Sequence, residues 1–342
     1  MKISVIMPCH NREYDLRRVL EAYDQQDASL PFEVIAVDDA STDHTYELLT
    51  SYQPEHYSLI IKRQGTNQGP AAARNEGIAL ARAPLILFVG DDILPAPGFV
   101  RQHIEAHTIH ADMTTAILGC TTWPPDITMN TLMAHIDGVG AQQFSYYYLR
   151  DGQEYDFRHF YTSNVSIKTD FLKSLNHWFD TDFTYAAFED AELAYRLSKN
   201  GLRILYISAP LAYHYHYHTI WTFSKRQYFS GLMACLLVKK HPQLSSLIKG
   251  RGWQRRVWLW RFQAALRKSS SINFKDLEMK ILSRASTYEA QPQMNIINIY
   301  EQTLNYYFTK GLIYGTFSKN IADRVNAIYA QQKLGPLLTK PR

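Results

Sequence analysis

The amino-acid sequence predicts an α/β fold, in which helices flank a mainly parallel central sheet, followed by a mostly helical C-terminal region. In the first hundred residues, short β-branched runs alternate with segments of helical spacing, the pattern of βαβ units. From residue 221 onward the pattern is mostly helical. The 342 residues, 46% of them apolar, suffice for one large domain and a smaller appendage.

Four apolar runs in the first hundred residues are expected to be strands, and the segments between them to be helices. The strands are 3–7, 32–37, 58–62 and 85–89. The helices are 14–26, 41–52 and 69–83. The second helix is expected to begin at a cap made by Ser41 or Thr42.

Beyond residue 110 the periodicity is less regular. The expected elements are strands at 115–120 and 159–168, a helix at about 130–150, and extended segments at 202–207 and 211–218. The clearest helix is 188–201, because acids occupy its first turn and Gly201 suits its C-terminal end.

Charge is distributed unevenly along the chain. Residues 1–192 contain 13 Lys and Arg but 27 Asp and Glu, a net charge of −14, whereas residues 193–275 contain 15 Lys and Arg and no acid. The acidic part is suited to a metal or polar ligand, and the basic part to an anionic partner such as lipid phosphate or nucleic acid.

Composition and motifs argue against several classes of protein. Three widely spaced cysteines indicate neither a disulfide framework nor a zinc cluster, and they fit a reducing cytosol. The N-terminal apolar stretch is too short for a signal peptide, and no apolar run reaches the roughly 18 residues of a membrane span. The chain has no G-x-G-x-x-G after the first strand and no P-loop motif, which argues against a dinucleotide fold and a P-loop NTPase.

Polar residues follow the expected strands at one edge of the sheet, where ligands of open parallel sheets bind. These strand ends carry residues 8–11, Asp38 and Asp39, residues 64–68, and Asp91 and Asp92. Adjacent carboxylates repel each other and need a cation or solvent beside them. Because a lone Asp-Asp pair is most often a solvated turn, its role depends on the neighbouring motifs.

Six motifs follow one another between residues 3 and 218. They are SVIMPCHNR, FEVIAVDDAS, NQGPAAARNEGI, LILFVGDDILPAPGF, FEDAELAYRL and LAYHYHYH. In this order they resemble a family 2 glycosyltransferase with the GT-A fold, over about two-thirds of the chain. The resemblance implies a GT-A catalytic domain at 1–220, with a nucleotide-sugar-binding half at about 1–110 and an acceptor half at about 111–220, and a helical region at 221–342.

The resemblance implies transfer of a sugar from a nucleotide diphosphate donor, usually a UDP-sugar, to a hydroxyl of a glycan or lipid-linked saccharide, with inversion at the anomeric carbon. The leaving diphosphate needs a countercharge, which a divalent cation supplies, and carboxylates suit Mn²⁺ or Mg²⁺. Asp91 and Asp92 match the family's D-x-D position, with Asp92 as the metal ligand and Asp91 near the ribose or the metal. The family often has Asp where this chain has Gly90.

The HYHYH run is expected to supply a further metal ligand. In an extended segment, His214, His216 and His218 would share one face, and on their own they would also suit a structural role or zinc. In similar enzymes a histidine after the acidic helix binds the same cation. His214 is therefore the predicted ligand, with His216 as the alternative.

Further residues are assigned to the nucleotide by the same resemblance. Asp39, with Asp38 beside it, would accept the N3 hydrogen of uracil, although an acid here also suits an Asx turn or a helix cap. The remaining matches are Pro8, His10 and Asn11 at the base and ribose, and Arg74 at the nucleotide or the acidic loops.

Asp190 in FEDAELAYRL is the predicted general base. Inverting displacement requires a base that takes the acceptor proton while the new bond forms. Glu189 would hydrogen-bond hydroxyls of the donor or acceptor. Acids in a first helical turn are also favoured by the helix dipole, which is sufficient to explain Glu192.

A basic, tryptophan-rich stretch begins at Lys225. It suits the solvated face of an accessory domain, or a helix lying on an anionic membrane surface at the cytoplasmic face. No nucleic-acid partner is expected, because no recognition motif accompanies the charge. An oligomer-forming role is also open. In the membrane interpretation the apolar side chains enter the interface and the arginines meet lipid phosphate. These residues are Trp258, Leu259 and Phe262, and Arg255, Arg256, Arg261 and Arg267.

Two other functions stay open from the sequence alone. A nucleotidyltransferase shares the need for a nucleotide and a metal, but requires more basic residues than the one arginine of PCHNREYD. The chain could also be a catalytically silent scaffold subunit that binds a nucleotide sugar. In that case Asp190→Asn should leave the partner system working.

Overall fold

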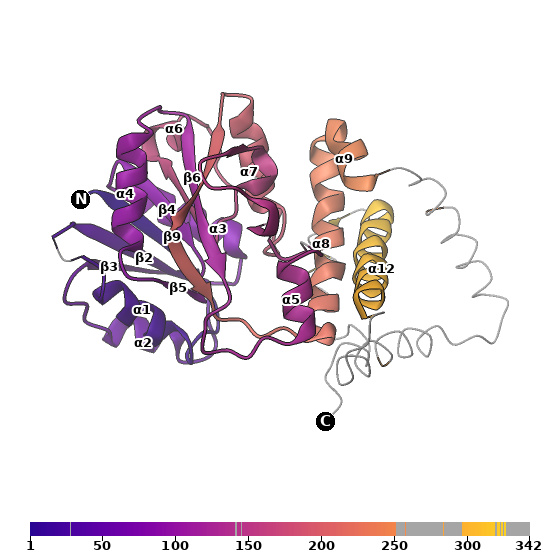
Figure 1. The fold of residues 1–342 in the computed structure, drawn as a ribbon, viewed down its shortest axis with the longest axis horizontal. Helices are drawn as coiled ribbons and strands as arrows, with labels where there is room; N and C mark the ends of the chain where they lie inside the picture. Colours follow the sequence, from indigo (N-terminus) through magenta and orange to yellow (C-terminus); the bar gives the residue numbers. More distant parts are fainter. Residues whose placement is uncertain are drawn as a thin grey trace. The chain divides into compact units, whose positions relative to one another are not determined.

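The computed structural model describes residues 1–250 except 28, 141 and 145, residues 296–318, and the single positions 257, 283, 320, 321, 323 and 325. The chain divides into two compact units (Figure 1). The first comprises Met1–Met129 and Ile136–His216, and the second comprises Asn130–His135 and the chain from Tyr217 onward.

One sheet forms the centre of the first unit. Among the described residues its nine strands are β1 (Ile3–Cys9), β2 (Phe32–Asp38), β3 (Ser58–Arg63), β4 (Leu85–Val89), β5 (Ile93–Pro95), β6 (Thr115–Thr122), β7 (Glu154–Tyr155), β8 (Asn164–Lys168) and β9 (Arg203–His214). Their order is β3-β2-β1-β4-β8-β6-β9-β5, and β7 pairs with β9. The predicted parallel pairing is confirmed for β3-β2-β1-β4, whereas β8 pairs antiparallel with both β4 and β6.

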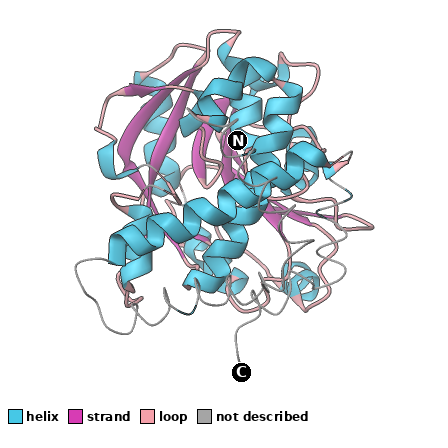
Figure 2. Ribbon diagram, turned by 90° about the vertical axis from the view of Figure 1, so that its right-hand side faces the viewer, coloured by secondary structure: helices cyan, strands magenta, loops and turns pink. Residues whose placement is uncertain are grey.

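Helices cover both faces of this sheet, as the cyan helices around the magenta strands of Figure 2 show. The helices of one face are α1 (Leu16–Asp24), α2 (Thr45–Ser51) and α4 (Phe99–Ile109), and those of the other are α3 (Pro70–Leu80), α6 (Thr169–Lys173) and α7 (Glu189–Ser198). Along β1, Val5 and Met7 pack with the first group and Ile6 with the second. This alternation is that of a strand buried on both faces, and it confirms the predicted α/β class.

The second unit is helical where it is described. Its elements include α8 (Ile220–Lys240), the short 3₁₀ helix η3 (Pro242–Leu244), α9 (Ser245–Lys249) and α12 (Ile296–Phe317). Helices α8 and α12 approach closely at two glycines, because a Cβ on Gly231 would lie 2.1 Å from the Phe308 carbonyl oxygen and one on Gly311 1.9 Å from that of Tyr228. A larger residue at either position would push the helices apart.

In the part of the chain that the structure describes, no helix is both long and apolar enough to cross a bilayer. The residues of the membrane-surface prediction lie outside the described residues: Trp258, Leu259, Phe262, Arg255, Arg256, Arg261 and Arg267. That prediction therefore stays a prediction.

Three local predictions are wrong. The helix expected at about 130–150 is limited to α5 (Thr131–Asp137) and a 3₁₀ turn, η1 (Tyr146–Tyr148). The strand expected at 159–168 is confined to β8, because a second 3₁₀ turn, η2 (Phe157–His159), precedes it. Helix α2 begins after His44 without a side-chain cap.

Candidate active site

The loop that carries the acid pair lies against the end of the longest strand. Strand β4 ends at Val89, and the short strand β5 that follows the acid pair runs antiparallel to β9, with Ile93 opposite His214. The backbone N–H of Tyr215 donates to the carbonyl oxygen of Asp92 at 2.8 Å. This pairing brings a carboxylate and the histidine run together, although they are about 120 residues apart in sequence.

Asp92, His214 and His216 form a candidate metal centre. Nε2 of His214 and Nδ1 of His216 each lie 3.4 Å from Oδ2 of Asp92, and one ligand atom from each residue lies within 4.8 Å of the others. The chain turns after β9, since the N–H of His216 donates to the carbonyl oxygen of His214 at 3.1 Å. One carboxylate oxygen and two imidazole nitrogens are a donor set that fits a divalent transition metal.

Aromatic rings hold the His214 imidazole in place. Trp123 stacks on it with ring centroids 5.3 Å apart and an interplanar angle of 18°, and His216 stacks with centroids 5.7 Å apart. Phe144 approaches the same ring edge-on. The stack follows from the pairing of β6 with β9, in which Thr122 lies opposite Tyr213, so that the next residues become neighbours. Partners that orient a metal-binding imidazole commonly tune metal affinity.

Arg12 bridges the two carboxylates of the acid pair. Its Nε donates to Oδ1 of Asp91 at 3.0 Å, and its Nη2 donates to Oδ2 of Asp92 at 2.9 Å. The remaining oxygen of Asp91 accepts the backbone N–H of His10 at 3.0 Å. Sequence reasoning did not assign Arg12 to the site. The signal was its position as the single arginine in the loop after the first strand.

The two carboxylates of the pair have opposite pKa shifts. Burial raises the pKa of Asp91 to about 6, despite the opposing effect of Arg12. Burial also acts on Asp92, but there the charge and hydrogen bonds of His214, with His216 and Arg12, prevail and hold the pKa well below its usual range. Asp92 is therefore an ionised carboxylate at neutral pH, the state that a metal ligand needs.

Two of the predicted nucleotide residues, His10 and Asp39, lie on the loops after β1 and β2. Oδ1 of Asp39 accepts the N–H of Gln68 at 2.7 Å and Oδ2 that of Gly69 at 2.8 Å. Burial raises the pKa of Asp39, although these N–H groups oppose the shift. The exposed His10 donates through Nδ1 to the carbonyl oxygen of Asp39 at 2.8 Å. The Asp39 carboxylate is thus held in one orientation next to a solvent-accessible ring.

Other residues predicted to bind the nucleotide have clear contacts within the protein. Asn11, at a positive φ of 54°, donates its backbone N–H to Ser41 Oγ at 3.0 Å. Ser41 does not cap α2, because that helix begins only after His44. The fully buried Asp38 pairs with Arg63 at 3.1 Å. Pro8 lies within β1, opposite Val37 of β2. Their contacts with a nucleotide stay predictions.

The predicted base lies at the N-terminus of α7. Oδ1 of Asp190 accepts the N–H of Ala191 at 2.7 Å. Burial, followed by the charge of Glu189, raises the pKa of Asp190 to about 7, while Arg74 opposes the shift. Glu189 and Arg74 form a buried ion pair at 2.8 Å, with exposed fractions of 3% and 7%. Arg74 thus braces the acidic helix α7, whereas its predicted contact with the nucleotide or the acidic loops stays a prediction.

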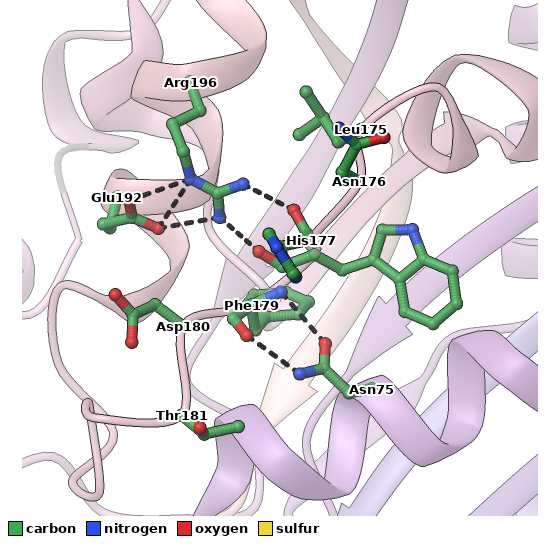
Figure 3. A pocket seen from close by; sticks show the side chains of 10 residues that line it. Asn75, Leu175, Asn176, His177, Phe179, Asp180, Thr181, Glu192 and Arg196 are labelled. Carbon is green, nitrogen blue, oxygen red and sulfur yellow. Dashed lines mark hydrogen bonds and ion pairs between the residues drawn. The ribbon is translucent and has the colours of Figure 1, made fainter.

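A separate cavity of about 780 Å³ lies beside the loop that leads into α7 (Figure 3). Asn75 holds this loop through both backbone groups of Phe179, with hydrogen bonds of 2.8 and 2.9 Å. On the other side Arg196 pairs with Glu192 at 2.8 Å and donates to the carbonyl oxygens of the loop. These contacts fix the approach to α7, and hence the position of its first turn.

The fold and the site have the features of the GT-A type, namely an acid pair at a strand end, a histidine at the end of β9 and an acidic helix. Residues 4–172 match the family model described as glycosyl transferase family 2, and this part of the chain belongs to that family. The predicted family and fold are confirmed.

Known proteins similar to this chain agree with that assignment. Validoxylamine A glucosyltransferase of Streptomyces hygroscopicus is 32% identical over 225 residues, which cover 58% of this chain and 52% of the relative. The chain thus spans about half the length of this curated relative.

Solved structures share the fold at lower identity. Staphylococcus aureus TarS, residues 1–349 in complex with UDP, is 18% identical with a TM-score of 0.52, and the alignment covers 97% of this chain and 92% of that one. The mannosyltransferase PcManGT of Pyrobaculum calidifontis, in complex with GDP-Man and Mn²⁺, is 17% identical with a TM-score of 0.58, covering 93% and 88%.

Proposed function

We propose that the protein is an inverting glycosyltransferase that moves a sugar from a UDP-sugar to an acceptor hydroxyl with the help of a divalent cation. The observation that carries the proposal is the meeting of Asp92, one member of the acid pair, with His214 and His216 at the sheet edge. A cation held there would neutralise the charge that develops on the leaving nucleoside diphosphate.

The ligand chemistry supports Mn²⁺ more than Mg²⁺ as the preferred cation. Mg²⁺ favours oxygen ligands, whereas imidazole nitrogen suits first-row transition metals, and two of the three donors here are imidazoles. The PcManGT structure is a complex with GDP-Man and Mn²⁺, which is in line with this choice.

Asp190 would act as the general base on the acceptor. Its Oδ1 accepts the N–H of Ala191 at 2.7 Å, which orients the carboxylate, and the carboxylate oxygens retain lone pairs that can take the hydroxyl proton. A pKa of about 7 is close to the pH at which a base is both available and strong enough. The charge of Glu189 helps to set that pKa, and Arg74 keeps Glu189 in place.

A uracil base would be recognised by Asp39. Its carboxylate is aligned by two backbone N–H groups, and each oxygen retains a lone pair for a ring N–H. The presence of UDP in the TarS complex supports uracil as the base. We further propose a glycan or lipid-linked saccharide as the acceptor, reached from the cytoplasmic side of an anionic membrane.

A donor panel tests this function. The full chain is incubated with UDP-, GDP- and dTDP-sugars in Mn²⁺ or EDTA, and release of nucleoside diphosphate is measured. We expect release from a UDP-sugar in Mn²⁺ only, with loss of metal-dependent donor binding in Asp92→Ala and normal binding without turnover in Asp190→Asn. Pyrophosphate release would indicate a nucleotidyltransferase instead. Donor binding with no turnover under any condition would favour the silent scaffold.

A further inference from the structure

The Asp92 carboxylate oxygen at the centre of the candidate metal site already accepts a hydrogen bond from the guanidinium group of Arg12. Oδ2 of Asp92 accepts from Arg12 Nη2 at 2.9 Å and is the same atom that His214 and His216 face at 3.4 Å. A metal ion at this site and the Arg12 guanidinium therefore act on one carboxylate oxygen.

The position of Arg12 is set by its backbone as well as by the acid pair. Its N–H donates to Thr45 Oγ1 at 2.6 Å, and its carbonyl oxygen accepts the N–H of Leu16 at 3.0 Å, at the start of α1. The Arg12 side chain is 25% exposed and those of Asp91 and Asp92 are 13% exposed. Because solvent has little access, the charges act on each other with little screening.

The charge of Arg12 has opposite effects on the binding of a cation and of a diphosphate. With both acids ionised, Asp91, Asp92 and Arg12 have a net charge of about −1, which a divalent cation alone would turn to about +1. The diphosphate of a nucleotide sugar, with about −2, would return it to about −1. Without Arg12 the acid pair would have about −2, and a cation alone would neutralise it fully.

We propose that Arg12 makes binding of the cation depend on the nucleotide diphosphate, so that the two ligands bind together rather than singly. The inference rests on the proposed function, because it assumes that both ligands bind at this site. Arg12 repels a lone divalent cation from Asp92 and attracts the diphosphate that accompanies it. Arg12 is a positioning residue in this scheme, since it sets the charge and orientation of the metal ligand.

The coupling is measured as a ratio of two affinities. Mn²⁺ binding to the full chain is followed by the electron paramagnetic resonance signal of free Mn²⁺, with and without saturating UDP. The wild type is expected to bind Mn²⁺ about tenfold or more tightly with UDP, within the roughly 5–150-fold range usual for coupled sites. In Arg12→Gln we expect tighter binding of Mn²⁺ alone, weaker binding of UDP in Mn²⁺, and a ratio below about threefold.

Two further variants make the result specific. Arg101→Gln removes the same charge from an exposed position on α4, away from the acid pair, and is expected to keep the wild-type ratio. Arg12→Lys keeps the charge while losing the bridging geometry, and is expected to retain most of the coupling. A thermal unfolding midpoint measured without Mn²⁺ or UDP, and close to the wild-type midpoint, confirms that each variant is folded.

The outcomes separate this inference from the function beneath it. If the ratio of Mn²⁺ affinities with and without UDP is the same in Arg12→Gln as in the wild type, the proposed role of Arg12 is overturned. The proposed function is then left intact. Equal losses in Arg12→Gln and Arg101→Gln also overturn it, because net charge alone would then account for the effect. A wild type that binds neither Mn²⁺ nor UDP overturns the proposed function and this inference with it.

Discussion

Replacement of the predicted base by its neutral isostere should stabilise the protein while it abolishes transfer. Asp190 lies at the partly buried N-terminus of α7, next to the buried Glu189. An ionised carboxylate in this position is disfavoured by burial and by its neighbour's charge, as its raised pKa shows. Asp190→Asn removes that charge with little change in shape.

The size and sign of the effect follow from the pKa. A rise from 3.8 to about 7 corresponds to at most about 4 kcal/mol, at about 1.36 kcal/mol per pKa unit. Because the folded-state pKa is raised, the folded protein binds the extra proton between about pH 4 and 7, and stability falls as the pH rises through that range. The variant should thus match the wild type near pH 4 and exceed it at pH 8.

The difference is measured as a thermal midpoint across pH. At about 2–4 °C per kcal/mol for a unit of this size, the Asp190→Asn midpoint should exceed the wild-type midpoint by up to about 8–16 °C at pH 8. Asp170→Asn is the matched control, since it removes an exposed carboxylate from the first turn of α6, and a surface substitution of this kind should change the midpoint little. A difference for Asp190→Asn that is constant from pH 5 to 8 would refute the buried-base account.

Two further changes test the surroundings of the site, and a third tests His103, a buried histidine of α4 that contacts Ser166 and Asn164 of β8. Trp123→Ala should weaken Mn²⁺ binding by about tenfold or more, because His214 loses the ring that orients it, whereas Trp123→Phe should cost less than about threefold in the same titration. Gly90→Ala should weaken Mn²⁺ binding by about tenfold, since the new Cβ would lie 2.8 Å from Oδ1 of Asp92; unchanged affinity in calorimetry would contradict this crowding. Burial lowers the pKa of His103 to about 4, so stability should fall by up to about 3 kcal/mol as the pH drops from about 6.5 to 4. In His103→Gln the difference between the urea unfolding midpoints at pH 7 and pH 4.5 should be smaller than in the wild type. An equal difference in the two proteins would contradict this prediction.

Much of the fold could be predicted because each strand of the parallel half has its own local signal. The runs at β1, β2, β3 and β4 are apolar, β-branched and bounded by polar turns, and their predicted bounds agree with the structure to within two residues. Asp92 and His214 could be paired in advance only through the family resemblance. Their contact depends on the pairing of β5 with β9, which no local pattern indicates.

The parts that sequence reasoning missed depend on contacts between distant segments. Arg12 looks like an ordinary loop arginine until the acid pair, 79 residues further on, lies against it. The segment after α5 was expected to be a helix, but Phe144 packs against the ring of His214 and Tyr146 against Tyr206, and these tertiary contacts favour a 3₁₀ turn. Ser41 or Thr42 was expected to cap a helix, but α2 begins only after His44, and the Ser41 hydroxyl accepts the backbone N–H of Asn11.

Anomalous diffraction from crystals grown with Mn²⁺ and UDP tests the central claim most directly. The account predicts one manganese peak within about 2.0–2.4 Å of Asp92, His214 and His216, with the diphosphate oxygens completing its coordination. A manganese peak bound elsewhere while these three residues keep their metal-free contacts, or UDP bound at this sheet edge with no manganese beside it, would contradict the account.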